Sequence, residues 1–438
     1  MKVLKFGGTS VGSPQRMKDV AKLITDGERK IVVLSAMSGT TNTLVEISDY
    51  LHKKNPDGAN EVINRLENKY KQHINELFST EEFRQKGMEL LKVRFELLRS
   101  YTKDLFTLFE ERIVLAQGEL LSTTMVNYYL QEQGVKSVLL PALDFMRTDK
   151  NAEPDLPYIK ERLAQQLEAN PDAEIYITQG FICRNAYGEV DNLQRGGSDY
   201  SASLIGAAVK ADEIQIWTDI DGMHNNDPRI VDKTSPVRHL HFEEAAELAY
   251  FGAKILHPTC IQPAKYANIP VRLLNTMDTK AEGTMISNET EKGKIKAVAA
   301  KENITAIKIK SSRMLLAHGF LRKVFEIFEK YQTSIDMICT SEVGVSVSID
   351  NTKHLNEILD ELRKYGTVTV DHNMCIICVV GDLEWENVGF EAKALDAMRD
   401  IPVRMISFGG SNYNISFLVR ECDKKAALQS LSDQLFNN

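Results

Sequence analysis

Short apolar runs rich in Val and Ile alternate with helical segments from residue 1 to about residue 290, and this alternation indicates an α/β fold. Nearly continuous apolar runs are typical of a sheet covered by helices on both faces. The runs are KVLKF at the start and then 31–36, 137–142, 174–180, 213–218 and 270–274. Residues 60–112 instead carry apolar side chains at helical spacing and predict a helical insertion. Because 438 residues exceed one compact core, two or three domains are expected.

The pattern changes near residue 300, where a strand-helix-strand-strand-helix order begins and then occurs a second time. The first copy contains the strict alternation VGVSVSI at 343–349, and the second contains the apolar run CIICVVG at 375–381. This order predicts two ferredoxin-like modules with antiparallel sheets. Cys375 and Cys378 have redox or metal spacing, but residues three apart in a strand point to opposite faces. A buried strand is therefore the better interpretation of this pair.

The charge balance and the cysteine usage exclude some classes of protein. The formal net charge is -8 and the sequence pI about 5.7, whereas nucleic-acid-binding proteins normally carry a basic surplus. No apolar stretch approaches the roughly 20 residues that span a bilayer, and no signal peptide precedes Lys5. The six cysteines are scattered, as expected of reduced thiols. We therefore expect a cytoplasmic protein without nucleic-acid or membrane partners.

The stretch KFGGTSVG at residues 5–12 combines a lysine with two adjacent glycines directly after the first apolar run. Backbone N–H groups of such a turn can converge on an anion, and Lys5 adds a positive charge. The alternative is a tight strand-to-helix turn in which Ser10 or Ser13 caps the next helix, with Pro14 in its first turn. This stretch alone leaves both interpretations open.

Two further stretches are equally ambiguous. Thr41, in SAMSGTTN, follows the second strand, where open α/β folds bind ligands, but it also fits a helix cap. Glu119, in AQGELLSTTM, stands just inside a mostly apolar helix. It is either a receptor for a ligand ammonium group or a first-turn carboxylate stabilised by the helix dipole.

The stretch QRGGSDYSA favours function more strongly. Arg195 and two glycines precede Asp199 at the start of a helix, which is an arrangement suited to an anion, and the guanidinium can donate two parallel hydrogen bonds to a carboxylate. Farther along, WTDIDGMHNNDPRIV has turn chemistry of its own but could also hold a nucleotide. Lys254, in the apolar FGAKILHP, must reach solvent or meet an anion. The P-loop and protein-kinase motifs are absent from the sequence.

Together, KFGGTSVG, GELLST, QGF, QRGGSDYSA, WTDIDGM…DPR and FGAKILHP resemble the aspartate kinases of the amino-acid-kinase fold over essentially the whole chain. The C-terminal modules resemble ACT domains. The resemblance implies a three-layer α/β sandwich at 1–294 and a regulatory region at 295–438. The latter would hold two interleaved ACT domains, about 311–380 and 381–438 with 295–310. The resemblance ends with the second module, so we expect a monofunctional kinase without the homoserine dehydrogenase half of bifunctional relatives.

The resemblance implies transfer of the γ-phosphoryl group of ATP, with Mg²⁺, to the β-carboxylate of L-aspartate. The product is 4-phospho-L-aspartate, in the first step of lysine, threonine and methionine biosynthesis. Catalytic roles would fall to Lys5, Asp199 and Lys254, and no metal-ligating residue is assigned. ATP would be bound by Lys5, Gly7, Gly8, Thr218, Asp219, His224, Asp227, Arg229 and Lys254. L-Aspartate would be bound by Thr41, Glu119 and Arg195. His224 stands where the family commonly has Tyr, near the adenine or ribose.

The stretch from His318 to Asp350 resembles the effector-binding part of lysine-sensitive aspartate kinases. We expect an amino-acid site at an ACT–ACT interface between chains, in a homodimer or a dimer of dimers. Asp336 would face the effector's ammonium group. The site would be lined by Met314, Ala317, Phe320, Leu321, Ser334, Asp336 and Thr340. Lysine is the favoured effector, although Ala317 replaces a frequent hydroxyl residue and leaves threonine open. The alternative is that these modules only dimerise.

The residues leave two rival functions open. One is another amino-acid kinase, of the acetylglutamate or glutamate 5-kinase type, but Glu119 argues against an N-acylated substrate, which has no ammonium group. The other is a non-catalytic amino-acid sensor. Both lysines, Asp199 and Arg195 argue against it, because charged groups are costly to keep without a partner.

Overall fold

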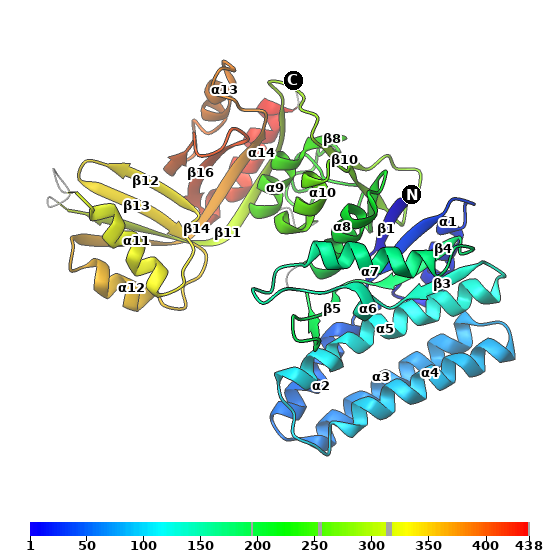
Figure 1. Cartoon of the computed structure of the whole chain (residues 1–438). Helices are drawn as coiled ribbons and strands as arrows, with labels where there is room; N and C mark the ends of the chain where they lie inside the picture. The colour runs from blue at the N-terminus through cyan, green and yellow to red at the C-terminus, as the bar shows by residue number, and fades with distance from the viewer. Residues whose placement is uncertain (194–195, 253–255, 312–317, 437–438) are drawn as a thin grey trace. The chain divides into compact units, whose positions relative to one another are not determined.

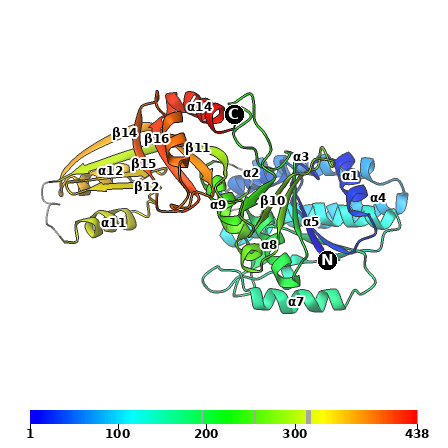
Figure 2. The same cartoon turned by 90° about the horizontal axis from the view of Figure 1, so that it is seen from above.

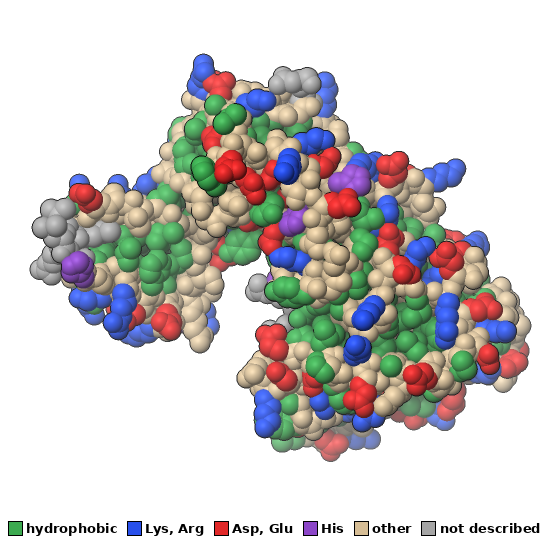
Figure 3. All heavy atoms as spheres, turned by 45° about the horizontal axis from the view of Figure 1, so that its top comes forward, with side chains coloured by type: hydrophobic (Ala, Val, Ile, Leu, Met, Phe, Trp, Pro, Cys, Tyr) green, Lys and Arg blue, Asp and Glu red, His purple; other side chains and the backbone are tan. Residues whose placement is uncertain are grey.

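A computed structural model describes residues 1–193, 196–252, 256–311 and 318–436. The chain divides into two compact units, Met1–Met223 with Leu256–Asn288, and His224–Ile255 with Glu289–Asn438. Among the described residues, no helix has the length and apolarity that crossing a membrane requires. On the face drawn in Figure 3, Lys and Arg side chains are interspersed with Asp and Glu.

The first unit is built on a mainly parallel sheet in the strand order β3-β4-β2-β1-β7-β9-β10. Only the pairing of β9 with β10 is antiparallel among the pairs described in this sheet. The strands are β1 (Lys2–Phe6), β2 (Lys30–Leu34), β3 (Ser137–Leu140), β4 (Ile175–Gln179), β7 (Ile214–Thr218), β9 (Val271–Asn275) and β10 (Thr284–Ser287), beside a hairpin of β5 (Ile182–Arg184) and β6 (Val190–Asn192). The expected α/β sheet is confirmed.

Helices cover both faces of this sheet (Figures 1 and 2). On one face, Leu4 and Phe6 pack into a core shared with α1 to α5. Side chains alternate along a strand, so Lys5 points to the opposite face, where α8 packs on β1. The helices are α1 (Pro14–Ile24), α2 (Thr40–His52), α3 (Pro56–Leu77), α4 (Glu81–Ser100), α5 (Leu108–Glu132), α6 (Ala142–Phe145), α7 (Leu156–Glu168), α8 (Gly197–Val209), η1 (Pro258–Ile261) and α10 (Gln262–Tyr266).

The helical insertion expected at 60–112 is confirmed by α3, α4 and the first turn of α5. The expectation that Glu119 stands in a first turn is wrong, because α5 already begins at Leu108. Thr107 caps that start, and Glu110 completes a capping box with it. Glu119 therefore lies in the middle of a long helix, and the helix dipole does not explain it.

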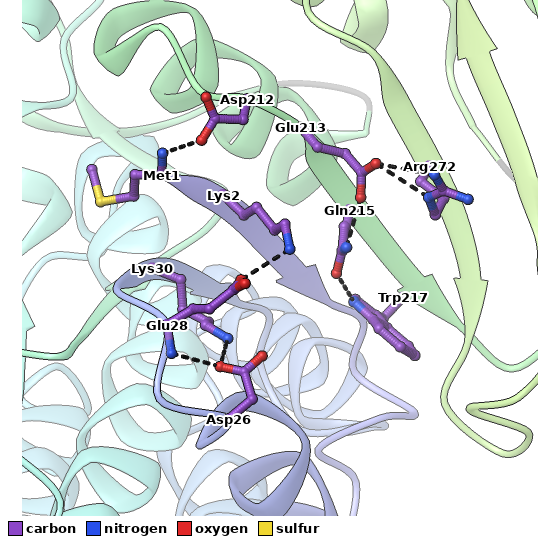
Figure 4. A network of polar contacts seen from close by, with 10 residues as sticks. All are labelled: Met1, Lys2, Asp26, Glu28, Lys30, Asp212, Glu213, Gln215, Trp217 and Arg272. Atoms are coloured by element: carbon purple, nitrogen blue, oxygen red, sulfur yellow. Dashed lines mark hydrogen bonds and ion pairs between the residues drawn. The ribbon is translucent and has the colours of Figure 1, made fainter.

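A polar network fastens the amino ends of the parallel strands (Figure 4). Lys2 pairs with Glu28 at 2.9 Å, and the amino group of Met1 pairs with Asp212. Farther across the sheet, Arg272 pairs with Glu213 at 3.2 Å. The loops that carry the motifs follow the strands directly, so they turn at the opposite, carboxyl edge.

The second unit contains an antiparallel sheet in the order β12-β13-β11-β14-β16-β15. Its strands are β11 (Ile295–Lys310), β12 (Met337–Ser341), β13 (Gly344–Ile349), β14 (Thr367–Gly381), β15 (Val403–Ser407) and β16 (Asn414–Arg420), with β8 (His239–His241) elsewhere in the unit. Its helices are α9 (Phe242–Tyr250), α11 (Phe320–Lys330), α12 (Leu355–Leu362), α13 (Phe390–Ala397), η3 (Glu421–Asp423) and α14 (Lys424–Leu435). The doubled strand-helix-strand-strand-helix order is confirmed.

Two hydrophobic cores support the two modules. One contains α11 and α12, and the other contains α13 and α14. The long strands β11 and β14 pair along their length and contribute to both cores. Cys375 and Cys378 lie in β14 as buried free thiols, so the buried-strand interpretation is confirmed.

Candidate active site

The loops that follow β1, β2, β4 and β7 meet at the carboxyl edge of the parallel sheet. Hydrogen bonds continue the strand pairing into these loops: Ser35 donates its N–H to the Phe6 carbonyl at 3.2 Å, and Gly180 donates to Leu34 at 3.0 Å. Gly7 donates to the Trp217 carbonyl at 3.3 Å. Ligands of open α/β sheets bind at this edge, so it is the candidate active site.

Lys5 and Asp199 form an ion pair at this edge. Lys5 Nζ lies 2.6 Å from Asp199 Oδ1, and the two side chains are only 11% and 14% exposed. Lys5 comes from β1 and Asp199 from the first turn of α8. The structure thus brings together two of the three residues expected to be catalytic. The third, Lys254, lies outside the described residues, as does Arg195.

Glycines allow the loops to pack closely around this ion pair. A Cβ atom on Gly8 would lie 2.7 Å from the Ala36 carbonyl oxygen, and one on Gly180 would lie 2.6 Å from the Ser198 side chain. Ser35 donates its hydroxyl to Ser198 Oγ at 2.9 Å and so joins the loop after β2 to the start of α8. The sequence analysis missed this serine pair, although Ser35 lies in SAMSGTTN and Ser198 lies in QRGGSDYSA.

Glu119 is a buried carboxylate close to the loop after β2. It accepts the Ala36 N–H at 3.2 Å through Oε1, while Oε2 has no hydrogen-bond partner among the described residues. Burial raises the pKa of Glu119 to about 7, although the Ala36 N–H lowers it. Gly118 lets α5 approach Ala36 and Thr40, and half-buried Thr41 stands next in α2. Glu119 and Thr41 are therefore near the same loop, and an unsatisfied buried oxygen suits a cationic ligand group.

The ends of β7 and β9 are tied to the glycine-rich loop. Thr276 donates both its N–H and its hydroxyl to the Thr218 carbonyl, each at 2.8 Å. Its hydroxyl also lies 3.2 Å from Ser10 Oγ. Asp219, expected in the nucleotide pocket, is exposed beside Thr218. Thr276 was missed by the sequence analysis, although its position directly after a strand was a usable signal. Ser13 caps α1, as the alternative interpretation of the KFGGTSVG stretch expected.

Three residues expected to bind the nucleotide lie in the second unit. Arg229 donates to both carboxylate oxygens of Asp227, at 2.9 and 2.7 Å, and this guanidinium lowers the pKa of Asp227. His224 Nδ1 lies 2.9 Å from Thr234 Oγ1. Asp227 and Arg229 therefore already pair with each other within the Asp-Pro-Arg turn.

The residues expected to bind an effector differ in their surroundings. Met314 and Ala317 lie outside the described residues. Phe320 packs into the core of its module, whereas Leu321, Ser334 and Thr340 are exposed. The Asp336 side chain is buried and pairs with Lys301 at 2.8 Å. In this structure Asp336 therefore already holds an ammonium group from its own chain.

The donor set at the carboxyl edge fits a magnesium ion that ATP brings with it. Mg²⁺ usually binds through one or two carboxylates together with substrate phosphates. Asp199 and Asp219 provide carboxylates of this kind. Within the described ranges, no group of three or more His, Cys, Asp or Glu residues is arranged to hold a metal ion.

Comparison with known proteins decides the family. The sequence matches the amino acid kinase family over residues 1–275 and an ACT domain over residues 377–435. It is 34% identical over 471 residues to Aspartokinase 1, chloroplastic, of Arabidopsis thaliana, covering 100% of this chain and 80% of that protein. It is 33% identical over 447 residues to Lysine-sensitive aspartokinase 3 of Escherichia coli strain K12, covering 99% of both. The chain is an aspartokinase of the amino acid kinase family.

Solved aspartokinase structures agree in fold. The E. coli aspartokinase III complex with lysine and aspartate, in the T-state, has a TM-score of 0.82 at 33% identity, covering 100% of this chain and 99% of that one. The complex with aspartate and ADP, in the R-state, has a TM-score of 0.84 at 32% identity and covers 100% of both. The aspartokinase is thus an ATP-dependent enzyme with ACT regulation, and the rival amino-acid kinases and the non-catalytic sensor are not favoured.

Proposed function

We propose that Lys5 and Lys254 contact the phosphates of ATP from two sides and that Asp199 orients the lysines. The observation that carries this is the Lys5–Asp199 ion pair of 2.6 Å beside the glycine-rich loop. The β-carboxylate of aspartate, with an ordinary pKa of about 3.9, is already ionised at neutral pH, so no general base is needed. The difficulty is that an anion must approach a polyanion, and positive charge offsets that repulsion.

The nucleotide would lie along the glycine-rich loop. Gly8 would offer its backbone N–H to the phosphates, and Gly7, whose N–H is donated to the Trp217 carbonyl, would contact them without a side chain in the way. Thr218 and Asp219 extend the same edge. His224, Asp227 and Arg229 would also contact the nucleotide. The complex of E. coli aspartokinase III with ADP supports ATP as the donor. Mg²⁺ supplies further positive charge at the phosphates when it is bound.

Aspartate would be held at both of its α-substituents. Glu119 would pair with the ammonium group, Arg195 would clamp the α-carboxylate, and Thr41 would add a hydroxyl. The buried, unpartnered oxygen of Glu119 supports the first assignment. Holding the substrate this way leaves the β-carboxylate free to attack the γ-phosphoryl group.

The second unit would carry the regulation. We propose that an amino acid, with lysine favoured over threonine, binds at an ACT–ACT interface of a homodimer or a dimer of dimers. Met314, Ala317, Phe320, Leu321, Ser334, Asp336 and Thr340 would line that site. The lysine-bound complex of E. coli aspartokinase III supports this choice.

We also propose the domain boundaries, the cellular location and the pathway of the enzyme. The catalytic domain would comprise 1–294 and the regulatory region 295–438, with the interleaved ACT boundaries given above. The enzyme would act in the cytoplasm, in the first step toward lysine, threonine and methionine. Its six free cysteines support a reducing location.

The acyl phosphate product can be trapped with hydroxylamine and measured as a hydroxamate. We expect a signal with L-aspartate and ATP but not with glutamate or N-acetylglutamate. Lys5→Ala should lower kcat by at least about 100-fold, because charge stabilisation of the transferring group is lost. Lys22→Ala, at an exposed site on α1, is the matched control. Wild-type turnover by Lys5→Ala, or a hydroxamate signal with another acid, contradicts the proposal.

A further inference from the structure

Three side chains of the second unit form a polar cluster around Asp336, whose own side chain is buried while Tyr250 and Asp350 are partly open to solvent. Lys301 Nζ lies 2.8 Å from Asp336 Oδ1 and 2.9 Å from Asp350 Oδ2. The Tyr250 hydroxyl donates to the same Asp336 Oδ1 at 2.7 Å. Lys301 Nζ also lies 4.3 Å from the centre of the Tyr250 ring. We call Tyr250, Lys301, Asp336 and Asp350 the clasp.

The Asp336 carboxylate is shielded from solvent within the clasp. The Asp336 side chain is 0% exposed, and its Oδ2 atom has no hydrogen-bond partner among the described residues. The phenol of Tyr250 is neutral, because burial and the neighbouring Asp336 raise its pKa to about 12. Two carboxylates and one ammonium group then leave one net negative charge. An added cation would neutralise it, but it can reach Asp336 only if a member of the clasp moves.

Asp350 provides a second position for Lys301. Its side chain is 41% exposed and already contacts the Lys301 ammonium group. If Lys301 leaves Asp336, its ammonium group still pairs with Asp350 and becomes more exposed to water. The positive charge is therefore never buried without a partner. Exchange of partners therefore costs much less than breaking a buried ion pair outright.

The clasp also fastens the chain that leads to Lys254. Tyr250 is the last residue of α9, four positions before Lys254 in the sequence. Two residues later, Gly252 has a φ of +128°, and a Cβ atom there would lie 2.2 Å from the Ala300 carbonyl oxygen. Residues 250–252 are thus held against β11 next to Lys301 by two independent contacts.

We propose that Lys301 is a built-in competitor for the effector's ammonium group on Asp336, and that Tyr250 transmits its displacement to the end of α9 and Gly252, which precede Lys254 in the chain. This proposal rests on the effector site proposed above. Effector binding at Asp336 would move Lys301 onto Asp350 alone and release the Tyr250 hydroxyl. A ligand shifts an equilibrium only by binding one state better, and here the enclosed and opened clasps are the two states.

Opposite effects of two substitutions test the competition. Lys301→Met should lower the half-inhibitory concentration of L-lysine by at least about 5-fold, because the competitor is gone. Asp350→Asn should raise it by a similar factor, because Lys301 loses its alternative partner. Lys308→Met, at an exposed position of the same strand, is the control. L-Lysine and L-threonine are assayed at the same fixed pH, and activity without effector shows that each variant is folded.

Transmission is tested by Tyr250→Phe, which keeps the ring and removes the hydroxyl. L-Lysine should still bind by calorimetry, but maximal inhibition should fall; the exposed Tyr266→Phe is the control. If Lys301→Met and Asp350→Asn shift inhibition in the same direction, or Tyr250→Phe is inhibited as fully as wild type, the clasp proposal is overturned while effector regulation stands. If neither amino acid binds the wild-type enzyme, the effector site itself is refuted, and the clasp with it.

Discussion

Glu119 links protein stability and aspartate binding to pH, and Glu119→Gln separates the two effects. Glu119 is 3% exposed, and burial raises its pKa from the ordinary 4.5 to about 7. Between these two values only the unfolded chain releases the proton as the pH rises. The free energy of unfolding therefore falls by about 3 kcal/mol over this interval, at about 1.4 kcal/mol for each tenfold difference in proton affinity. Above pH 7 the loss of unfolding free energy caused by the buried Glu119 carboxylate no longer changes with pH.

Glu119→Gln removes the charge that folding must bury. We expect this variant to exceed the wild type in stability by about 3 kcal/mol at pH 8, but by less than about 1 kcal/mol at pH 5. Urea denaturation of the enzyme without substrate at both pH values measures the difference. Glu96→Gln, at an exposed site on α4, is the control and should show neither change.

Activity should change in the opposite direction. Binding of the aspartate ammonium group needs the ionised form of Glu119, whose fraction falls from about 0.9 at pH 8 to about 0.1 at pH 6. The kcat/KM for aspartate in the wild type should therefore fall about 10-fold over this range, because kcat/KM reports the free enzyme. Glu119→Gln should lose this pH dependence. It should also lower kcat/KM at pH 8 by at least about 10-fold, as expected for a hydrogen bond to a charged group.

Two outcomes would refute the proposed role of Glu119. A wild-type kcat/KM for aspartate that is flat between pH 6 and pH 8 would show that the titration of Glu119 does not govern binding. A Glu119→Gln enzyme no more stable than wild type at pH 8 would show that the buried carboxylate carries no ionisation penalty. Either result removes the physical basis for assigning the ammonium group to Glu119.

Two further substitutions test the site's scaffold. Thr276→Val removes the hydroxyl that joins Thr218 to Ser10, and it should raise the KM for ATP by about 3-fold or more and lower stability by about 1 kcal/mol; a changed aspartate KM with unchanged ATP KM contradicts this role. Thr107→Ala removes the capping box of α5 and should cost about 0.5–2 kcal/mol in urea denaturation with kcat unchanged; equal midpoints for both proteins would show that the cap contributes nothing.

Local sequence patterns predicted much of the fold. Hydrophobic periodicity is a property of each segment, so the parallel strands, the helical insertion and the doubled ferredoxin-like order could all be predicted. The start of α5 could not, because the apolar run around Glu119 hid a capping signal at Thr107, twelve residues before Glu119. The long pairing of β11 with β14, which joins both modules in one sheet, also depends on contacts that no single segment specifies.

By itself, the sequence determined the kinds of groups at the site: cations, glycines, hydroxyls and carboxylates placed where strands end. Only the tertiary structure decided which of them meet. Strand order placed β1 between β2 and β7, and α8 packed on the face to which Lys5 points, so Lys5 and Asp199 became partners. Packing of the elements likewise brought Lys301 next to Asp336, although the sequence around neither residue predicts this ion pair. The physical reason is that patterning acts through neighbours along the chain, whereas partner choice follows from how whole elements pack.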